Sequence, residues 1–130
     1  MIIEDRPPPP PTGVLAGQIS RAVVQLFREY TGRGPTQAHT TITEDLVLVM
    51  MGDTLLKAER SLARAGKGAL VLAMRSAVQD TMRVDLTEIV ERLSQRKVIA
   101  FMSQNHIDPD LASELFVLAP RDRTTTPADS

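Results

Sequence analysis

The sequence predicts an α+β domain with a four-stranded antiparallel sheet and helices packed mainly on one face. The predicted strands come in adjacent pairs, and the helices between those pairs follow one another directly. This order lacks the β-α-β alternation of a parallel sheet. The chain of 130 residues has the usual size of one domain, and its 42% hydrophobic content with a net charge of -1 suits a folded protein. The predicted element order is αββαααββ.

The first predicted helix covers residues 17–30. Its apolar side chains recur at the spacing that places them on one helical face, namely Ile19, Val23, Leu26, Phe27 and Tyr30. Gly32, Gly34 and Pro35 follow directly, and residues of these types end helices.

The first pair of strands is predicted at residues 38–43 and 46–51. The earlier segment is rich in β-branched residues and alternates roughly between polar and apolar side chains, which is typical of a half-exposed strand. All six residues of the later segment are apolar. Glu44 and Asp45 form a short polar turn between them, so the pair is expected to be an antiparallel hairpin.

Three further helices are expected before the next strand. Asp53 is placed to cap the helix 54–65, and a second helix follows at 69–82. Asp85 and Glu88 have the spacing of a capping box and would open the last helix, which reaches Leu93. The inner faces of these helices are predicted to hold Leu55, Ala58 and Leu62, then Leu70, Met74, Ala77 and Val78, then Leu86, Ile89, Val90 and Leu93.

The second pair of strands is predicted at residues 98–102 and 114–118, joined by a turn-forming connection at 106–110. The expected domain therefore extends over 13–119. The proline-rich segment 1–12 and the polar segment 120–130 offer little apolar surface to bury and are expected to be disordered.

The composition limits both the cellular location and the kinds of catalytic or metal-binding chemistry that can be expected. No apolar stretch approaches the roughly 20 residues of a membrane helix, and the N-terminal segment lacks the pattern of a secretory signal, so a cytoplasmic protein is expected. The absence of cysteine excludes disulfides and thiolate chemistry. No catalytic residues, cofactor or metal are predicted. His106, Asp108 and Asp110 carry metal-ligating groups, but their spacing around a proline is typical of an ordinary turn.

The clearest charge asymmetry lies in residues 57–83, which hold six basic and two acidic side chains. This segment either forms a solvated helix face or contacts an anion or a partner. The residues predicted for such a contact are Lys57, Arg60, Arg64, Lys67 and Arg75. Nucleic acid is disfavoured as the partner, because aromatic residues make up only 3% of the chain and the pI is about 6.1.

The strand 46–51 also predicts an assembly. A strand with one face in water should alternate, whereas this strand and the strand 98–102 are apolar on both faces. We therefore expect a homodimer, or a higher even oligomer, that buries the sheet face opposite the helices. The residues predicted for the dimer face are Val47, Val49, Met51, Ile99 and Phe101. The competing model is a three-layer monomer in which one helix crosses to the second face.

The order of several short motifs resembles one known family. They are Tyr30–Thr36, Asp45–Met51, Gly52–Glu59, Arg75 with Gln79 and Asp80, Arg96–Phe101, Asp108–Asp110 and Phe116–Leu118. This set resembles the small bacterial proteins of the MpsC-like family, although Gln95 stands where that family often has glycine.

The resemblance implies a soluble, non-enzymatic accessory or regulatory protein of a bacterial membrane ion or bicarbonate transport system, with a membrane transport protein as partner. The alternative, from the residues alone, is a small nucleic-acid-binding or ribosome-associated protein that uses the basic segment 57–83.

Overall fold

The computed structural model describes residues 10–121, and it confirms an α+β fold with one antiparallel sheet. The expected tails 1–12 and 120–130 lie largely outside these residues. The elements are α1 (Thr12–Thr31), β1 (Gln37–Thr43), β2 (Leu46–Gly52), α2 (Lys57–Arg64), α3 (Gly68–Ser94), β3 (Val98–His106) and β4 (Leu111–Leu118).

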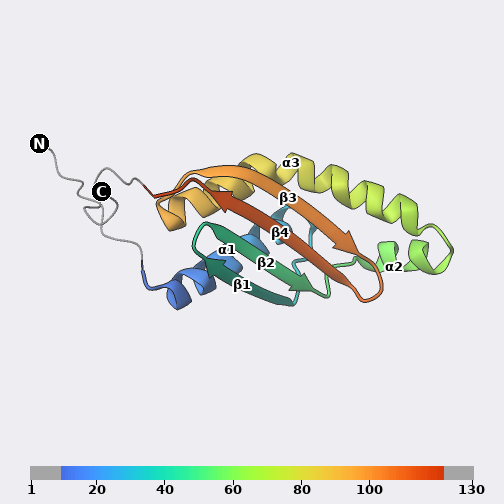
Figure 1. The fold of residues 1–130 in the computed structure, drawn as a ribbon. Helices are drawn as coiled ribbons and strands as arrows, with labels where there is room; N and C mark the ends of the chain where they lie inside the picture. Colours follow the sequence, from blue (N-terminus) through green and yellow to red (C-terminus); the bar gives the residue numbers. More distant parts are fainter. Residues whose placement is uncertain (1–9, 122–130) are drawn as a thin grey trace, which may run out of the picture.

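The sheet has the strand order β1-β2-β4-β3, and all neighbouring strands are antiparallel. The two predicted strand pairs are both present, and β4 joins them by pairing with β2. Figure 1 shows α1 and α3 on the same face of this sheet, with α2 beyond its end. The expectation that helices pack mainly on one face is therefore confirmed, and no helix of the described residues crosses to the other face.

The two long helices predicted after residue 69 form one continuous helix, so the described residues contain three helices rather than four. No glycine or proline interrupts α3 after Gly68, and Asp85 does not cap a new helix. Its carboxylate instead accepts a hydrogen bond from the Tyr30 hydroxyl at 2.7 Å. The helix ends at Gln95, which adopts the left-handed conformation (φ 63°) that glycine favours.

The inner face predicted for the first half of α3 is wrong. Leu70, Met74 and Val78 are exposed by 49%, 44% and 36%. The buried positions are Val71, Arg75 and Gln79, one residue further along the helix in each case. Tertiary contacts explain this difference, because Arg75 and Gln79 of α3 form hydrogen bonds with polar residues of the sheet.

The start of α2 also differs from the prediction. The helix begins at Lys57 rather than at residue 54, and Asp53 does not cap it. The Leu56 N–H donates to a Glu59 carboxylate oxygen at 2.8 Å, so an acidic side chain within the first turn satisfies this amide.

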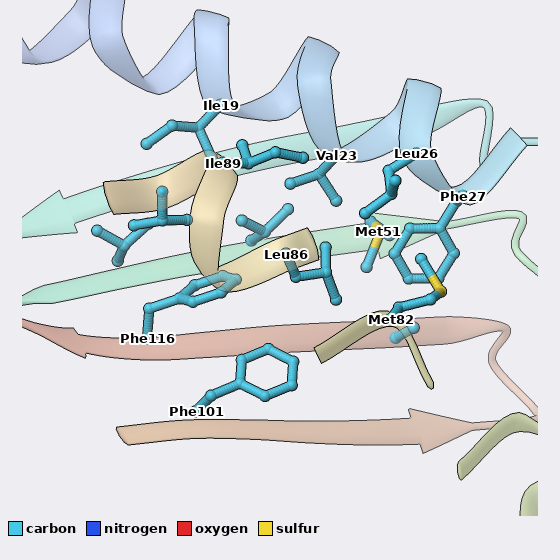
Figure 2. Packing of buried hydrophobic residues seen from close by; sticks show 14 of the residues in the cluster. Ile19, Val23, Leu26, Phe27, Met51, Met82, Leu86, Ile89, Phe101 and Phe116 are labelled. Atoms are coloured by element: carbon cyan, nitrogen blue, oxygen red, sulfur yellow. The ribbon is translucent and has the colours of Figure 1, made fainter. Parts of the chain in front are cut away.

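The core lies between the sheet and the pair α1 and α3. Figure 2 shows Ile19, Val23, Leu26 and Phe27 of α1 pointing toward Leu86 and Ile89 of α3 and toward Phe116 of the sheet. The Phe101 and Phe116 rings pack at a centroid distance of 5.0 Å. Fully burying side chains of this kind stabilises a fold by roughly 1.5–3 kcal/mol each, so this cluster supplies the main apolar stabilisation.

The residues predicted for the dimer face need correction. Val47, Val49, Met51 and Phe101 are buried in this core, beneath the helices. Ile99 is exposed, next to the irregularity between Val98 and Ala100 where β3 changes register against β4. The opposite face carries the alternate residues of the same strands. Both faces of β2 are apolar, so the sequence did not distinguish the covered face from the open one.

Candidate functional site

A buried ion pair connects α2 and α3. The Arg75 guanidinium donates to a Glu59 carboxylate oxygen at 2.9 Å, and the two side chains are only 8% and 9% exposed. Glu59 is the buried residue of α2, and it also accepts the Leu56 N–H. The pair therefore fixes the start of α2 against the first half of α3.

A chain of hydrogen bonds continues from this pair into the sheet. Arg75 Nε donates to Asn105 Oδ1 at 3.1 Å, and Asn105 Nδ2 donates to Gln79 Oε1 at 2.6 Å. Gln79 Nε2 then donates to Glu114 Oε2 at 3.0 Å, while the Ser103 hydroxyl bonds to the other oxygen of Glu114. We call this series of hydrogen bonds the polar network. It explains why the first half of α3 directs Arg75 and Gln79 toward β3 and β4.

Glu114 is fully buried at the inner end of the polar network. Burial raises the pKa of its carboxyl to about 7, because removal from water disfavours the charged form. The hydrogen bond from Ser103 and the positive charges of Arg75 and Arg83 act in the opposite direction and offset only part of this effect. The group therefore changes its charge near neutral pH, inside the core.

The turn between β3 and β4 holds the segment that precedes α2. Asp110 accepts the backbone N–H groups of Thr54 at 2.9 Å and Leu55 at 3.0 Å, together with the Thr54 hydroxyl at 2.8 Å. Burial alone would raise the pKa of Asp110, but these hydrogen bonds and the charge of Arg60 lower it overall. Asp110 is therefore a structural carboxylate held in its ionised form.

Asp53 forms a second, more exposed cluster at the same end of the molecule. It pairs with Arg33 at 2.6 Å and with Arg60 at 2.5 Å, and the Thr36 hydroxyl donates to it at 2.7 Å. The hydrogen bonds from Thr36 and Arg60 are the main causes that lower the pKa of Asp53. Arg60 also reaches Asp110 at 3.3 Å, so the two carboxylates share one guanidinium.

A cavity of about 260 Å³ opens beside the polar network, between α1, α2 and α3. It is lined by Glu59, Arg75 and Gln79 together with Phe27, Tyr30, Thr31, Leu56, Met74 and Val78. Among residues 10–121, Arg75 Nη2 and Glu59 Oε2 have no hydrogen-bond partner, yet neither is sealed from solvent. Both residues line the cavity, so a guanidinium and a carboxylate lie at its polar side.

The five basic residues predicted as a contact do not share one surface. Lys57, Arg64 and Lys67 are exposed on α2 and on the turn after it. Arg60 is engaged by Asp53 and Asp110, and Arg75 is buried in the polar network. The charge count along the sequence did not show that neighbouring carboxylates neutralise two of these five side chains.

Several residues of the site were not predicted as site residues. Glu59, Gln79 and Asp110 lie within the motifs that carry the family resemblance, and this was the available signal for them. Asn105 and Glu114 lie outside those motifs. Glu114 is the one charged residue of β4, and Asn105 stands among polar residues at the end of β3, so their contact with α3 is evident only once the strand pairing is known.

The histidine and aspartates of the β3–β4 connection do not come together as metal ligands. His106 Nδ1 lies 2.7 Å from the Pro109 carbonyl oxygen, and Asp110 faces the segment before α2. Nowhere in residues 10–121 do three His, Cys, Asp or Glu side chains gather in a group that could hold a metal ion.

The fold and the site together define a small two-layer α+β protein in which three buried polar residues of the motifs, Glu59, Arg75 and Gln79, connect α2, α3 and the sheet. The family model described as "Na+-translocating membrane potential-generating system (MpsC)" matches residues 12–120. The chain belongs to this MpsC family, as its motifs predicted.

Two relatives from Bacillus subtilis (strain 168) are similar over most of the domain. The uncharacterized protein YrhF is 27% identical over 95 residues, which cover 72% of this chain and 78% of the relative. The uncharacterized protein YbcI is 27% identical over 90 residues, which cover 68% and 73%. No solved structure matches the chain. Among the described residues, none of the helices combines the length and apolar character needed to span a bilayer.

Proposed function

We propose that this chain is a non-enzymatic accessory or regulatory protein, located in the cytoplasm, of a bacterial membrane system that transports ions or bicarbonate. Membership of a family named for a Na+-translocating, membrane potential-generating system supports this proposal. The partner would be a membrane protein of that system, which this chain contacts through its surface.

The observation that carries the proposal is the inverted polarity of the first half of α3. Its apolar side chains Leu70, Met74 and Val78, which we call the α3 stripe, face water, while Arg75 and Gln79 face inward. Large apolar side chains grouped along one helix commonly mark a contact surface for another protein.

The cavity adds to this surface. Met74 and Val78 of the α3 stripe also line the cavity, together with the charged side chains of Arg75 and Glu59. An apolar side chain of a partner would enter beside Met74. A peptide group of the partner would offer its carbonyl oxygen to Arg75 and its N–H to Glu59. The polar network lies on the buried side of α3 and holds this part of the helix in place. A partner can therefore bind the exposed side without a rearrangement of the helix.

The experiment compares a gene deletion with complemented strains. Deletion should reduce the Na+-dependent membrane potential or the bicarbonate uptake of the cells, and the unmodified gene should restore it. Met74→Glu places a charge on the α3 stripe and should fail to restore it. Ser76→Glu adds the same charge at another exposed position of α3 and should restore it fully.

Thermal unfolding of the two purified variants provides the control, because both positions are exposed and should leave the melting temperature within a few degrees. If deletion changes neither membrane potential nor bicarbonate uptake, the proposed function is wrong. If Met74→Glu restores both as well as Ser76→Glu does, the α3 stripe is not the contact.

A further inference from the structure

The sheet face that no described helix covers is continuous and apolar at its centre. Strand pairing places side chains of this open face in rows across the sheet. Thr41, Leu48, Leu115 and Met102 form the central row, and Thr43, Leu46, Val117 and Ala100 form the row beside it. Figure 1 presents this face toward the viewer, with α1 and α3 behind it.

The apolar side chains of the open face are substantially accessible. Leu46, Met50 and Met102 are exposed by 42%, 36% and 49%, and Leu48, Leu115 and Val117 are partly exposed between them. These residues come from three adjacent strands, so their exposed surfaces join into one patch. A contiguous patch of this kind is larger than the single apolar side chains that monomers commonly expose.

Among the paired strand residues that the structure describes, those on the open face include no Asp, Glu, Lys or Arg. Its remaining residues are Gln37, His39, Ser113, Gln104 and His106, with Gly52 and Leu111 at the far end. A neutral face of this composition offers no charge complementarity to nucleic acid, to anionic lipid or to a strongly charged protein. It does fit a second copy of itself, because two identical neutral faces meet without repulsion.

The dimensions of the face also suit a dimer. Four strands of about seven residues span roughly 19 by 23 Å at standard sheet spacings. The projected area is therefore roughly 450 Å². Side chains standing on a pleated sheet raise the accessible area above this value, toward the about 800 Å² per partner of a standard interface.

We infer that two copies of this chain pack their open faces against each other around a two-fold axis lying between the sheets. Leu48 and Leu115, the centre of the apolar patch, would meet the same residues of the second copy. The helices then lie on the outside of the dimer, and the α3 stripe stays free. This arrangement keeps the homodimer expected from the sequence but builds it from the alternate set of strand residues.

The test measures the mass of the full chain by sedimentation velocity at concentrations from below one micromolar to about one hundred micromolar, which correspond to association free energies of roughly 5–8 kcal/mol. The unmodified protein should sediment at twice its mass of 14.3 kDa at the upper end. Leu48→Lys should raise the dimer dissociation constant by roughly a hundredfold or more, because the symmetric interface contains the change twice.

Two further variants separate lost association from lost folding. Met102→Lys, at a more exposed position of the same face, should weaken the dimer while keeping a monomer-like circular dichroism spectrum. Val84→Lys, at an exposed position of α3, should leave the dimer intact. A monomer at every concentration of the unmodified protein overturns the inference. So does a dimer that survives Leu48→Lys and Met102→Lys but dissociates in Met74→Glu, which would place the interface on α3.

Discussion

Glu114 shows how one side chain couples this core to pH. Its carboxyl is enclosed by β3, β4 and α3, and its hydrogen-bond partners are Gln79 and Ser103. In the unfolded chain the pKa of this group is near 4.5, whereas burial raises it to about 7 in the folded protein. At pH values between 4.5 and about 7, the Glu114 carboxyl is protonated in the folded protein and ionised in the unfolded chain. Its contribution to stability is therefore fully present below pH 4.5 and is lost as the pH rises to about 7.

Replacing Glu114 with Gln should remove this pH dependence. The neutral amide keeps the shape of the side chain and can still accept from Gln79 and donate to Ser103. The difference between the pKa values of about 7 and 4.5 corresponds to roughly 3 kcal/mol. Glu114→Gln should therefore gain about that much unfolding free energy relative to the unmodified protein between pH 5 and pH 8. Urea unfolding of both proteins at the two pH values measures this change. An equal pH dependence in both proteins would contradict it.

Asp110 acts through the backbone groups that it accepts. Asp110→Ala leaves the amides of Thr54 and Leu55, in the segment before α2, without their acceptor. We expect a loss of about 2–3 kcal/mol in unfolding free energy, because hydrogen bonds to a charged group are stronger than average. Asp80→Ala, at an exposed position of α3, is the matched control and should cost less than about 0.5 kcal/mol. Equal losses in the two variants would show that Asp110 does not hold this segment.

At the scale of elements, α2 and α3 are joined by a charge pair rather than by an apolar face. Glu59 is the buried residue of α2, and Arg75 meets it from α3. Removing one member leaves the other buried without a counter-charge, which is far more costly than removing both. The position of α2 therefore depends in part on this pair, beside the bonds of Arg60 to Asp53 and Asp110.

A double-mutant cycle tests this dependence. Arg75→Met should destabilise the protein by about 3–5 kcal/mol, because Glu59 is then buried unpaired. The double variant with Glu59→Gln should recover at least about 1 kcal/mol of this loss, since no isolated charge remains. Chemical unfolding of the two single variants and the double variant gives the coupling energy. Additive effects would mean that the two residues stabilise the fold independently.

At the scale of the whole molecule, the sequence predicts what local patterns determine. Glycine at position 32 ends α1 with a positive φ of 83°, and the Glu44-Asp45 turn joins β1 to β2, both as predicted. The buried face in the first half of α3 was not predicted correctly. The residues that Gln79 contacts, Asn105 and Glu114, lie more than 25 residues away from it in the sequence. The sequence also did not predict which face of β2 the helices cover, because an entirely apolar strand has no pattern that distinguishes its two faces.

Motif residues were predicted more reliably than their roles. The ordered motifs led to the correct family, yet Asp53 is a partner of two arginines rather than a helix cap, and Arg75 is an internal rather than an exposed charge. Roles of this kind depend on which distant carboxylate lies opposite each guanidinium. Strand order and helix packing determine that arrangement.

Arg96 joins three parts of the molecule at the end opposite the polar network. Its guanidinium donates to the Glu44 carbonyl oxygen at 2.8 Å, to the Asp45 carboxylate at 2.6 Å and to the Ala119 carbonyl oxygen at 2.7 Å. The β1–β2 turn and the end of β4 are thus held by the residue that follows α3. A lysine ammonium is a single point of charge and cannot reproduce this forked geometry.

Arg96→Lys should therefore lower the unfolding free energy by about 1–3 kcal/mol while keeping the net charge. The loss should appear locally in hydrogen exchange. The Leu118 amide, which donates to the Asp45 carbonyl oxygen, and the Ala119 amide, which donates to the Lys97 carbonyl oxygen, should both exchange faster. Arg92→Lys, at an exposed position in the last turn of α3, is the matched control and should leave both amides unchanged. If Arg96→Lys leaves their exchange at the rate of the unmodified protein, the guanidinium does not hold these ends together, and strand pairing alone positions them.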